Sequence, residues 1–421
     1  MTKKLRLLVV GTGGREHAIA KSLAQSSLVE KVFCAPGNVG MASDKIEVVN
    51  IGELEFDALK GLVAEEQIDW TFVGPENALV AGIVDSFEAD GLKIFGPNKE
   101  AAQLEGSKDY AMRFMDQYQI PTAKFATYQS SETAIAGLKN FSEPIVIKAD
   151  GLAAGKGVVI APSKDEAEAE IRLMFKKGQK QIVLEEFLAG DEYSLFVLIG
   201  KSGYRILPMA QDHKRAFDQD KGPNTGGMGA YSPVPQLAKV DYQRMLTEVV
   251  EPTIAGLKQA NLNYQGVLYI GMILTAQGPK VIEYNVRLGD PETQVVLPRL
   301  ATDFAELINA FVTEANLPEV KVKPNACLGV VLAATGYPQA PLKGQAISLQ
   351  LADESLDIDY ANVTGSLDDL KGAGGRILTV LASAPSLAEA QLKVYECLNS
   401  QVQAETFYRK DIGFRATKAS F

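Results

Sequence analysis

The stretch Ile145-Val146-Ile147-Lys148-Ala149-Asp150-Gly151-Leu152-Ala153-Ala154-Gly155-Lys156-Gly157-Val158-Val159-Ile160 joins two apolar runs through a glycine-rich loop. Short apolar runs bounded by glycine predict two strands. The backbone N–H groups of such a loop can surround phosphate oxygens. The loop is not a P-loop, because that motif needs Gly at Asp150, Ser or Thr at Gly157, and a helix after it. Lys148 and Lys156 bracket the glycines and favour phosphate binding over a plain surface hairpin.

The residues around this loop extend it into a small α+β lobe. Ser163 and Glu166 have the spacing of a capping box, so a helix is expected to begin there and to end at Gly178. The apolar run 181–184 predicts a further strand. We expect the lobe to span 122–190.

A second informative stretch is Val281-Ile282-Glu283-Tyr284-Asn285-Val286-Arg287, where apolar and polar residues alternate as in a half-buried strand. Glu283, Asn285 and Arg287 would then share one face and span about 13 Å, at a rise of roughly 3.3 Å per residue. Two oxygen ligands beside a guanidinium would suit a metal-bound nucleotide. A solvated strand face with a charge pair would produce the same alternation.

The first hundred or so residues alternate strand and helix patterns. The apolar run 5–10 is typical of a buried parallel strand, and a helical pattern reaches Leu23. Further strands are expected at 32–38, 69–76 and 92–98. This alternation predicts a doubly wound parallel sheet, whose ligands bind at the carboxyl ends of the strands.

Turns rich in glycine follow three of these strands, at Gly11–Gly14, Gly37-Asn38 and Gly74–Glu76. They are candidates for one shared pocket, although each could be only a turn. The first has the strand–turn–helix order that presents N–H groups to a phosphate. A dinucleotide fingerprint would need a third glycine where this chain has Glu16, which argues against NAD.

Two polar loops interrupt the strand and helix patterns of the region 191–323. The loop 211–215 places His213 and two basic residues beside Asp212, and the loop 223–229 contains three glycines. Both could be solvated loops, and His213 could be a structural histidine. After residue 326, strands are expected at 328–333 and 376–381, and we find no catalytic constellation there.

The composition excludes several classes of protein. The 421 residues are 46% hydrophobic and 22% charged, and 42 basic against 52 acidic residues give a net charge of −10. This acidic balance argues against a nucleic-acid surface. No apolar run approaches the roughly 18 residues of a membrane span, and no signal-peptide pattern is seen, so we expect a cytoplasmic protein. The widely spaced Cys34, Cys327 and Cys397 indicate buried thiols in a reducing compartment.

Several ordered motifs resemble those of the phosphoribosylamine–glycine ligase family of ATP-grasp enzymes, from one end of the chain to the other. These motifs are 11–17, 148–157, 226–229, 287–292 and 409–413. The resemblance implies an α/β and α+β multidomain protein, with an N-terminal doubly wound parallel sheet, a two-lobed ATP-grasp core and a small C-terminal α+β domain. The implied parts are a substrate domain at 1–105, a connecting helix at 106–121, a small lobe at 122–190, a large lobe at 191–325 and a C-terminal domain at 326–421.

The resemblance also implies a reaction. ATP, glycine and 5-phosphoribosylamine would give ADP, phosphate and glycinamide ribonucleotide through a glycyl phosphate, in purine biosynthesis. The small lobe would close over ATP, and Mg²⁺ or Mn²⁺ would be the metal. Small molecules would be the partners, without nucleic acid or membrane, together with a transient contact with the enzyme that supplies phosphoribosylamine.

The resemblance carries roles to individual residues. Glu283 and Asn285 would bind the metal. The expected catalytic residues are Arg287, Lys148, Asp212 and Lys214. The resemblance places Arg287 on the glycyl phosphate, whereas the chemistry of the reaction suggests Asp212 for the glycine ammonium and Lys214 for a substrate anion. ATP contacts are expected from Lys108, Lys148, Gly151, Gly155, Lys156, Gly157, Glu185, Glu186, Leu188 and Glu192. Substrate contacts are expected from Gly11, Gly13, Gly14, Asn38, Pro75, Glu76, Gly226, Gly227, Met228, Arg287 and Asp290.

The sequence departs from other ATP-grasp enzymes at one position. Some of them have a further acidic metal ligand one strand before Glu283, where this chain has Gly271. Such a metal would have few protein ligands, which suits Mg²⁺. The alternatives are another ATP-grasp ligase or carboxylase, a non-catalytic nucleotide sensor, and a nicotinamide-dependent oxidoreductase built on Gly11–Gly14.

Overall fold

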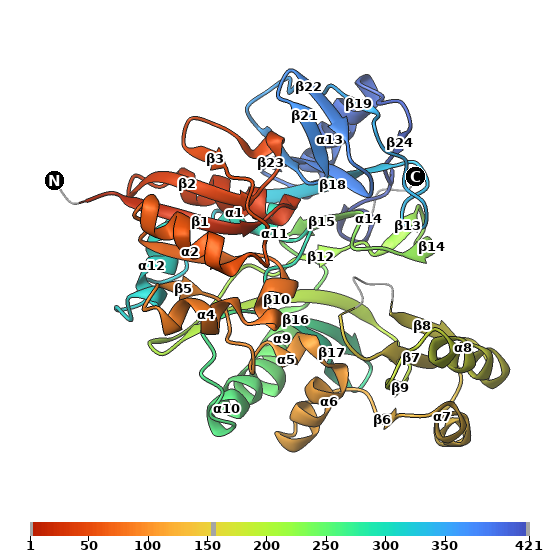
Figure 1. The fold of residues 1–421 in the computed structure, drawn as a ribbon. Coiled ribbons are helices and arrows are strands. Elements are labelled where there is room, and N and C mark those ends of the chain that lie inside the picture. Colours follow the sequence, from red (N-terminus) through yellow and green to blue (C-terminus); the bar gives the residue numbers. More distant parts are fainter. Residues whose placement is uncertain (1–2, 153–156, 418–421) are drawn as a thin grey trace.

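The computed structural model describes residues 3–152 and 157–417 (Figure 1). The N-terminal sheet and the C-terminal unit lie against each other, and the small lobe projects from the opposite side of the molecule. An antiparallel sheet of the large lobe lies between them.

The N-terminal sheet is parallel, with the order β3-β2-β1-β4-β5, which confirms the predicted doubly wound class. Residues Leu7 to Val10 are fully buried because helices cover both faces of the sheet. Its strands are β1 (Leu5–Gly11), β2 (Val29–Pro36), β3 (Ile46–Val48), β4 (Trp70–Val73) and β5 (Ile94–Phe95). Its helices are α1 (Gly14–Ala24), α2 (Phe56–Glu65), α3 (Glu76–Ala81) and α4 (Ile83–Ala89).

The small lobe has a hydrophobic core of its own, formed by one face of its sheet and its two helices. Its strands pair in the order β6-β9-β7-β8. Ser163 caps the second helix and accepts a hydrogen bond from Glu166 N, as predicted. The elements are α5 (Gln103–Gly106) and α6 (Lys108–Gln117) before the lobe, then β6 (Phe125–Tyr128), α7 (Ser131–Gly137), β7 (Ile145–Ala149), β8 (Val158–Ala161), α8 (Lys164–Lys176) and β9 (Ile182–Glu186).

The large lobe is built on a four-stranded antiparallel sheet with the order β11-β10-β16-β17. Its long central strands are almost entirely buried. The elements are β10 (Asp191–Gly200), β11 (Gly203–Ile206), β16 (Gly266–Thr275), β17 (Gly278–Asn285), α9 (Lys239–Met245), α10 (Glu251–Gln259), α11 (Thr293–Val296) and α12 (Phe304–Val312).

The C-terminal sheet includes strands from two distant parts of the chain. Its order is β12-β15-β18-β23-β20, and β24 also pairs with β18. Strand β12 (Gln211–Asp212) lies in the first polar loop and β15 (Gly229–Ser232) begins where the second ends, so both loops are joined to the C-terminal sheet. The other elements are β13 (Arg215–Phe217), β14 (Lys221–Asn224), β18 (Ala326–Ala334), β19 (Ala346–Ile347), β20 (Leu356–Tyr360), β21 (Val363–Ser366), β22 (Asp369–Gly372), β23 (Arg376–Ala384), α13 (Leu387–Ser400), β24 (Thr406–Phe407) and α14 (Phe414–Thr417).

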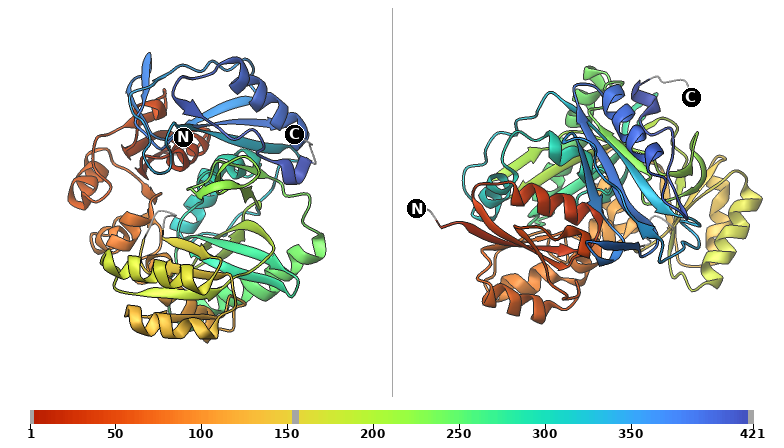
Figure 2. Two further views of the ribbon diagram at one scale, coloured as in Figure 1. Left: turned by 90° about the vertical axis from the view of Figure 1, so that its right-hand side faces the viewer. Right: turned by 90° about the horizontal axis from the view of Figure 1, so that it is seen from above.

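The C-terminal unit docks on helix α1 through buried polar groups, and the two units lie side by side in all views of Figures 1 and 2. His17 Nδ1 accepts a hydrogen bond of 2.9 Å from Tyr360 N, and the two rings stack at 5.8 Å. Lys21 Nζ lies 2.7 Å from the buried Asp359 carboxylate. These contacts fix the N-terminal glycine turn against the C-terminal sheet.

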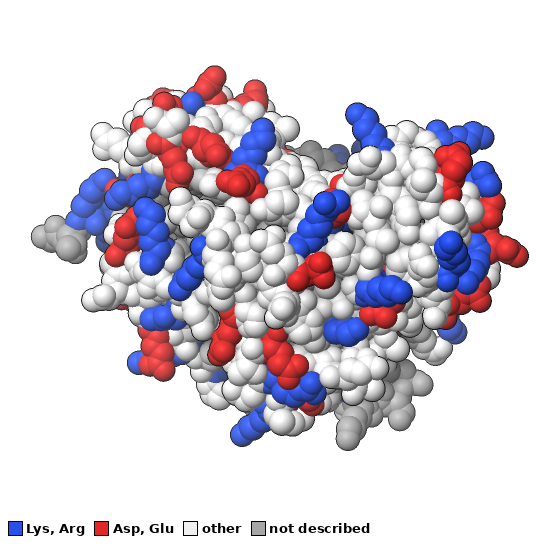
Figure 3. Space-filling model, turned by 90° about the horizontal axis from the view of Figure 1, so that it is seen from below, with Lys and Arg blue, Asp and Glu red and all other residues white. Residues whose placement is uncertain are grey.

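The surface carries charges of both signs, and the few cysteines lie in the interior. Lys and Arg are interspersed with Asp and Glu over the face shown in Figure 3. All three cysteines are buried, and the described residues contain no disulfide. None of the described helices is long and apolar enough to cross a membrane.

Candidate active site

Strand β17 carries the two predicted metal ligands at its carboxyl end. Residues Gly271 and Met272 of β16 pair with Glu283 and Val281, so Ile282 is the extra residue of a β-bulge. A Cβ on Gly271 would lie only 3.2 Å from Glu283 Cγ, which means that the glycine leaves room for the Glu283 side chain.

The strand ends at Asn285, and Arg287 lies in the bend that follows. This corrects the expectation that Glu283, Asn285 and Arg287 share one strand face. Arg287 nevertheless returns to the strand end, because its Nη2 donates a hydrogen bond of 3.0 Å to Asn285 Oδ1. Its guanidinium is also held by Glu105, at 2.8 Å, and Glu76, at 3.2 Å.

Cations surround the Glu283 carboxylate. Burial disfavours the ionised form, but the positive charges of Lys214 and Lys148 outweigh it, so the pKa of Glu283 is lowered. Asn285 is buried, and its Oδ1, which accepts from Arg287, keeps a second lone pair for a ligand. Two oxygen-bearing side chains at this strand end fit a divalent cation with few protein ligands. No group of three or more His, Cys, Asp or Glu residues in the described parts of the chain could hold a metal ion.

Lys148 connects the small lobe to this strand end. It is 5% exposed and donates a hydrogen bond of 3.0 Å to the carbonyl of the bulged Ile282. It also forms a 2.8 Å ion pair with Glu185, which is 4% exposed and whose Oε1 has no partner among the described residues. A buried charge pair of this kind is costly to break, so it fixes Lys148 beside Glu283.

Lys108 and Asp150 connect helix α6 to the base of the glycine loop. Asp150 Oδ1 accepts a hydrogen bond of 2.6 Å from Lys108 N, and Lys108 Nζ donates one of 2.5 Å to Gly151 O. Burial lowers the pKa of Lys108. Gly151 and Gly157 flank the loop, whereas Gly155 and Lys156 lie outside the described residues.

The predicted adenine edge lies where β9 ends. The Glu185 carboxylate already pairs with Lys148, and Glu186 Oε1 accepts from Lys280 Nζ and Lys124 N at 3.0 Å each. Both carboxylates are therefore already paired. The groups left to contact a ligand are the backbone after Glu186 and the half-buried Leu188.

Asp212 and Lys214 face the same region from the C-terminal sheet. Lys214 Nζ forms a 2.8 Å ion pair with Glu192 Oε2. Burial raises the pKa of Asp212 to about 7, with Lys214 opposing this and the charges of Glu292, Glu192 and Glu283 adding to it. The structure thus brings Asp212, Lys214 and Glu192 together with Glu283.

The N-terminal glycine turn is filled by a carboxylate. Glu16 is buried and accepts from Gly13 N at 2.7 Å and from Arg15 Nε at 2.5 Å. A Cβ on Gly11 or Gly74 would overlap the Glu16 side chain, so these glycines leave space for it. A carboxylate at the helix N-terminus competes with a pyrophosphate there, which argues against the dinucleotide alternative.

Other predicted substrate residues lie around this turn, and most are held by ion pairs or hydrogen bonds. Asn38 Nδ2 donates to Thr12 O at 2.8 Å and to Ala361 O at 3.1 Å. Although burial opposes ionisation of Glu76, the nearby Arg287 and Arg15 lower its pKa to about 2. Pro75 precedes Glu76 at the start of α3 and is buried.

The loop 226–228 meets Asp290 at the edge of the C-terminal unit. Arg376 Nη2 lies 3.2 Å from Asp290 Oδ2, and Arg376 Nη1 donates to Gly226 O at 2.9 Å. Gly227 has a φ of +113° and packs against Pro291, whereas Met228 is fully buried in the core. The Met228 side chain therefore anchors this loop to the core and does not face a substrate.

Sequence reasoning missed five residues that complete these contacts: Arg15, Glu16, Glu105, Gln294 and Arg376. The adjacent charges Arg15-Glu16 at the start of a buried helix were a usable signal. Arg376 comes from a distant strand, and nothing in its local sequence indicates its contact with Asp290.

Family models match nearly the whole chain. They are described as phosphoribosylglycinamide synthetase N domain (residues 5–105), ATP-grasp (A) domain (106–293) and C domain (327–415). The phosphoribosylamine–glycine ligase of Streptococcus suis is 48% identical over 421 residues, covering 98% of this chain and 100% of the relative. That of Lactococcus lactis is 48% identical over 414 residues, with the same coverage.

Solved structures agree. The phosphoribosylamine–glycine ligase of Thermotoga maritima has a TM-score of 0.84 and 36% identity, covering 97% of this chain and 100% of its own. The biotin carboxylase domain of the 2-oxoglutarate carboxylase of Hydrogenobacter thermophilus has a TM-score of 0.75 at 15% identity, over 97% and 92% of the two chains, and this likeness concerns the fold alone.

Proposed function

The chain belongs to the phosphoribosylglycinamide synthetase family, and we propose that it joins glycine to 5-phosphoribosylamine with ATP, releasing ADP and phosphate and forming glycinamide ribonucleotide. The observation that carries the proposal is the cluster at the end of β17. There Lys148, Lys214 and Arg287 surround a carboxylate whose pKa they lower.

The first step proposed is transfer of the γ-phosphoryl group to the glycine carboxylate. Two anions must meet, so catalysis depends on positioning and on charge stabilisation. Lys148 and Lys108 would hold the phosphates, and Arg287 would hold the glycyl phosphate as it forms. Because Glu76 and Glu105 fix the Arg287 guanidinium, little reorganisation is needed when the charge develops.

In the second step the amine of phosphoribosylamine attacks the glycyl carbonyl and phosphate leaves. A neutral amine needs no strong base for this attack. Asp212 would hold the glycine ammonium and Lys214 a substrate anion. Closure of the small lobe would exclude water, which would otherwise hydrolyse the acyl phosphate.

The ATP-grasp enzymes use ATP with a divalent metal, and we propose Mg²⁺, with Mn²⁺ as a substitute. Glu283 and Asn285 would hold it, since their oxygens suit a hard cation that keeps waters and phosphate ligands. When bound, the ion would neutralise charge on the ATP phosphates.

We further propose a cytoplasmic location and small-molecule partners. Buried, unpaired cysteines suit a reducing compartment such as the cytoplasm. The acidic net charge of −10 does not suit nucleic acid, so the partners proposed are ATP, glycine and phosphoribosylamine. A transient contact with the enzyme that supplies phosphoribosylamine would protect this labile amine.

Glycine labelled with heavy oxygen in its carboxylate tests the mechanism. The label should appear in the released phosphate, because the carboxylate oxygen leaves with it. Unlabelled phosphate would refute the acyl phosphate. Replacing glycine by bicarbonate, with phosphoribosylamine present, separates this ligase from a carboxylase, which would release ADP only with bicarbonate.

A further inference from the structure

The segment 211–215 presents its side chains alternately to two environments. Gln211 and His213 are 2% and 1% exposed, whereas Asp212 and Lys214 are half-buried and point away from them. This alternation is that of an extended chain. The backbone of His213 is held by two hydrogen bonds, from its N to Gly229 O at 2.9 Å and from Met228 N to its O at 2.8 Å. The orientation of Asp212 and Lys214 therefore depends on this backbone pairing and on whatever holds the His213 side chain.

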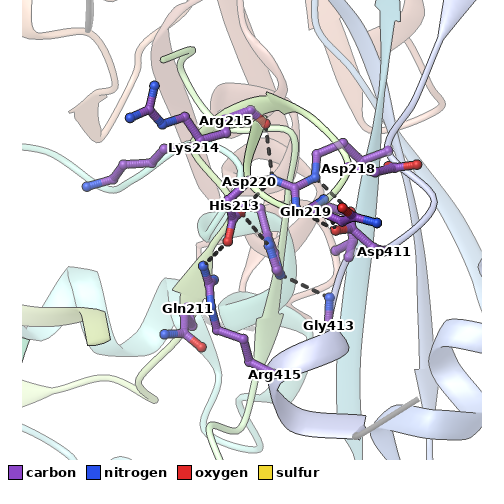
Figure 4. Close-up of polar contacts among 12 residues, drawn as sticks. Gln211, His213, Lys214, Arg215, Asp218, Gln219, Asp220, Asp411, Gly413 and Arg415 are labelled. Carbon is purple, nitrogen blue, oxygen red and sulfur yellow. Dashed lines mark hydrogen bonds and ion pairs between the residues drawn. The ribbon is translucent and has the colours of Figure 1, made fainter. Parts of the chain in front are cut away.

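His213 is held by the C-terminal tail (Figure 4). Its Nε2 accepts a hydrogen bond of 3.0 Å from Gly413 N, and its ring packs against Phe414 at 5.5 Å and Tyr231 at 6.0 Å. Burial lowers the pKa of His213 to about 4, so the ring is neutral near pH 7. Because Nε2 accepts, the proton lies on Nδ1, which faces Asp220 at 3.9 Å.

The tail is in turn clamped to the hairpin of β13 and β14. Arg409 has a fully buried side chain and bonds Asp411 at 2.8 and 2.9 Å and Asp220 at 2.9 Å. Asp411 Oδ2 also accepts from Gln219 N at 2.7 Å. In Figure 4, Gln219 and Asp411 lie on one side of His213 and Lys214 lies on the other. Gly413 N is thus a fixed donor.

We propose that His213 is a positioning residue, which anchors segment 211–215 to Gly413 of the C-terminal tail and so directs Asp212 and Lys214 into the active site. The proposal rests on the proposed function, in which Asp212 and Lys214 contact substrate. It gives the C-terminal tail a role in substrate binding that acts through segment 211–215. The 2.8 Å ion pair with Glu192 shows which way the Lys214 side chain points, and we propose that His213 maintains this orientation.

Two substitutions in the full chain distinguish the effect of the hydrogen bond between His213 and Gly413 N from the effect of the packed volume of the ring. His213→Phe keeps the volume and the aromatic contacts but leaves Gly413 N without its acceptor. His213→Gln is smaller but offers a neutral acceptor oxygen. We expect His213→Phe to lower kcat/KM for glycine by ~10- to 100-fold, as small displacements of reacting groups do. The effect on the KM for ATP should be smaller, because ATP is touched only through Glu192, the partner of Lys214. His213→Gln should recover most of the loss.

The matched control is Lys410→Ala, because Lys410 belongs to the same tail and has an exposed side chain. It should behave as wild type. All proteins are assayed below their melting temperatures, which are measured alongside. If His213→Phe affects glycine and ATP equally, or if His213→Gln rescues nothing, the role is merely structural and the proposal falls.

A double-mutant cycle with Lys214→Ala adds a sharper test. If His213 acts through Lys214 and Asp212, the loss caused by His213→Phe should shrink in the Lys214→Ala background, because coupled residues are not additive. Fully additive losses would overturn the proposal. Failure of the proposed function is distinguishable, since the wild-type enzyme itself would then show no glycine-dependent ADP release, and this inference would fall with it.

Discussion

The two polar regions of this molecule differ in how completely their groups are satisfied. Around the N-terminal glycine turn, Glu16, Asn38 and Asp290 each have several partners from the same or a distant unit. At the end of β17, Asn285 Nδ2 and Glu185 Oε1 are buried and have no partner among the described residues. Buried polar groups are rarely left unpaired without a reason. The turn region has one as well, Gln294 Oε1, but only the end of β17 combines such atoms with a carboxylate, Glu283, whose pKa neighbouring cations lower, so the second region is the one prepared for a ligand.

Lys148→Met should break the second region most severely. It would leave Glu185 buried and unpaired, and removing one partner of such a pair typically costs about 3–5 kcal/mol of unfolding free energy. Urea unfolding of wild type and variant measures this. The double variant Lys148→Met/Glu185→Gln should recover much of the loss, and an unchanged stability in the single variant would contradict the buried pair.

Arg287→Ala should raise the barrier of the reaction by about 2–4 kcal/mol, as loss of one preorganised donor does. Steady-state ADP release measures the effect. Arg113→Ala is a matched control, because the Arg113 side chain is 70% exposed on α6. Turnover near that of wild type would remove Arg287 from the mechanism.

Arg376→Met tests the satisfied region. It would remove hydrogen bonds to charged and carbonyl groups at Asp290 and Gly226, at a cost of about 1.5–3 kcal/mol in unfolding free energy. Since these contacts hold the loop rather than the nucleotide, the KM for ATP should not change. A selective rise in the KM for ATP would show that the two regions are not separate.

Glu283→Ala should raise the Mg²⁺ concentration needed for half-maximal activity by at least about tenfold, because one of few protein ligands is lost. A Mg²⁺ titration of ADP release measures it. An unchanged titration curve would place the metal elsewhere.

The smallest effect expected is a pH dependence of glycine use. Burial raises the pKa of Asp212 to about 7, so the free enzyme carries the carboxylate only above that pH. Because the carboxylate is what would hold the glycine ammonium, kcat/KM for glycine should rise as the pH increases through about 7. The rise should be no more than about tenfold per pH unit, as for one ionisation. Asp212→Asn should abolish it, and a persisting rise would exclude Asp212 as its source.

Local patterns were sufficient for much of the fold. The apolar run 5–10 predicted a buried parallel strand, and Ser163 predicted a helix start, because each depends on neighbouring residues only. The bulge at Ile282 was not predicted, because the sequence shows the same alternation of apolar and polar residues whether or not a bulge is present. Strand β12 has two residues, which is too short for any periodicity, so its place in the C-terminal sheet was not foreseeable.

In the candidate site too, the residues with a local sequence pattern could be predicted, and their long-range partners could not. Glu283 and Asn285 were named from their alternation in a strand, and the structure puts them beside Lys148 and Lys214. What the sequence lacked were the long-range partners, such as Arg376 on Asp290, or Gly413 on His213. Their separation along the chain leaves no local pattern from which pairing could be inferred.

The insertion of β15 beside β18 has a practical consequence. A chain cut near residue 325 would leave Gly229–Ser232 on one fragment and its partner Ala326–Ala334 on the other. Each fragment would then expose a strand edge that fits the other, and exposed edges readily form hydrogen bonds with another strand. We therefore expect the fragments to recover an intact fold only when they are mixed, so that the enzyme could be divided into two halves whose reassembly reports on proximity.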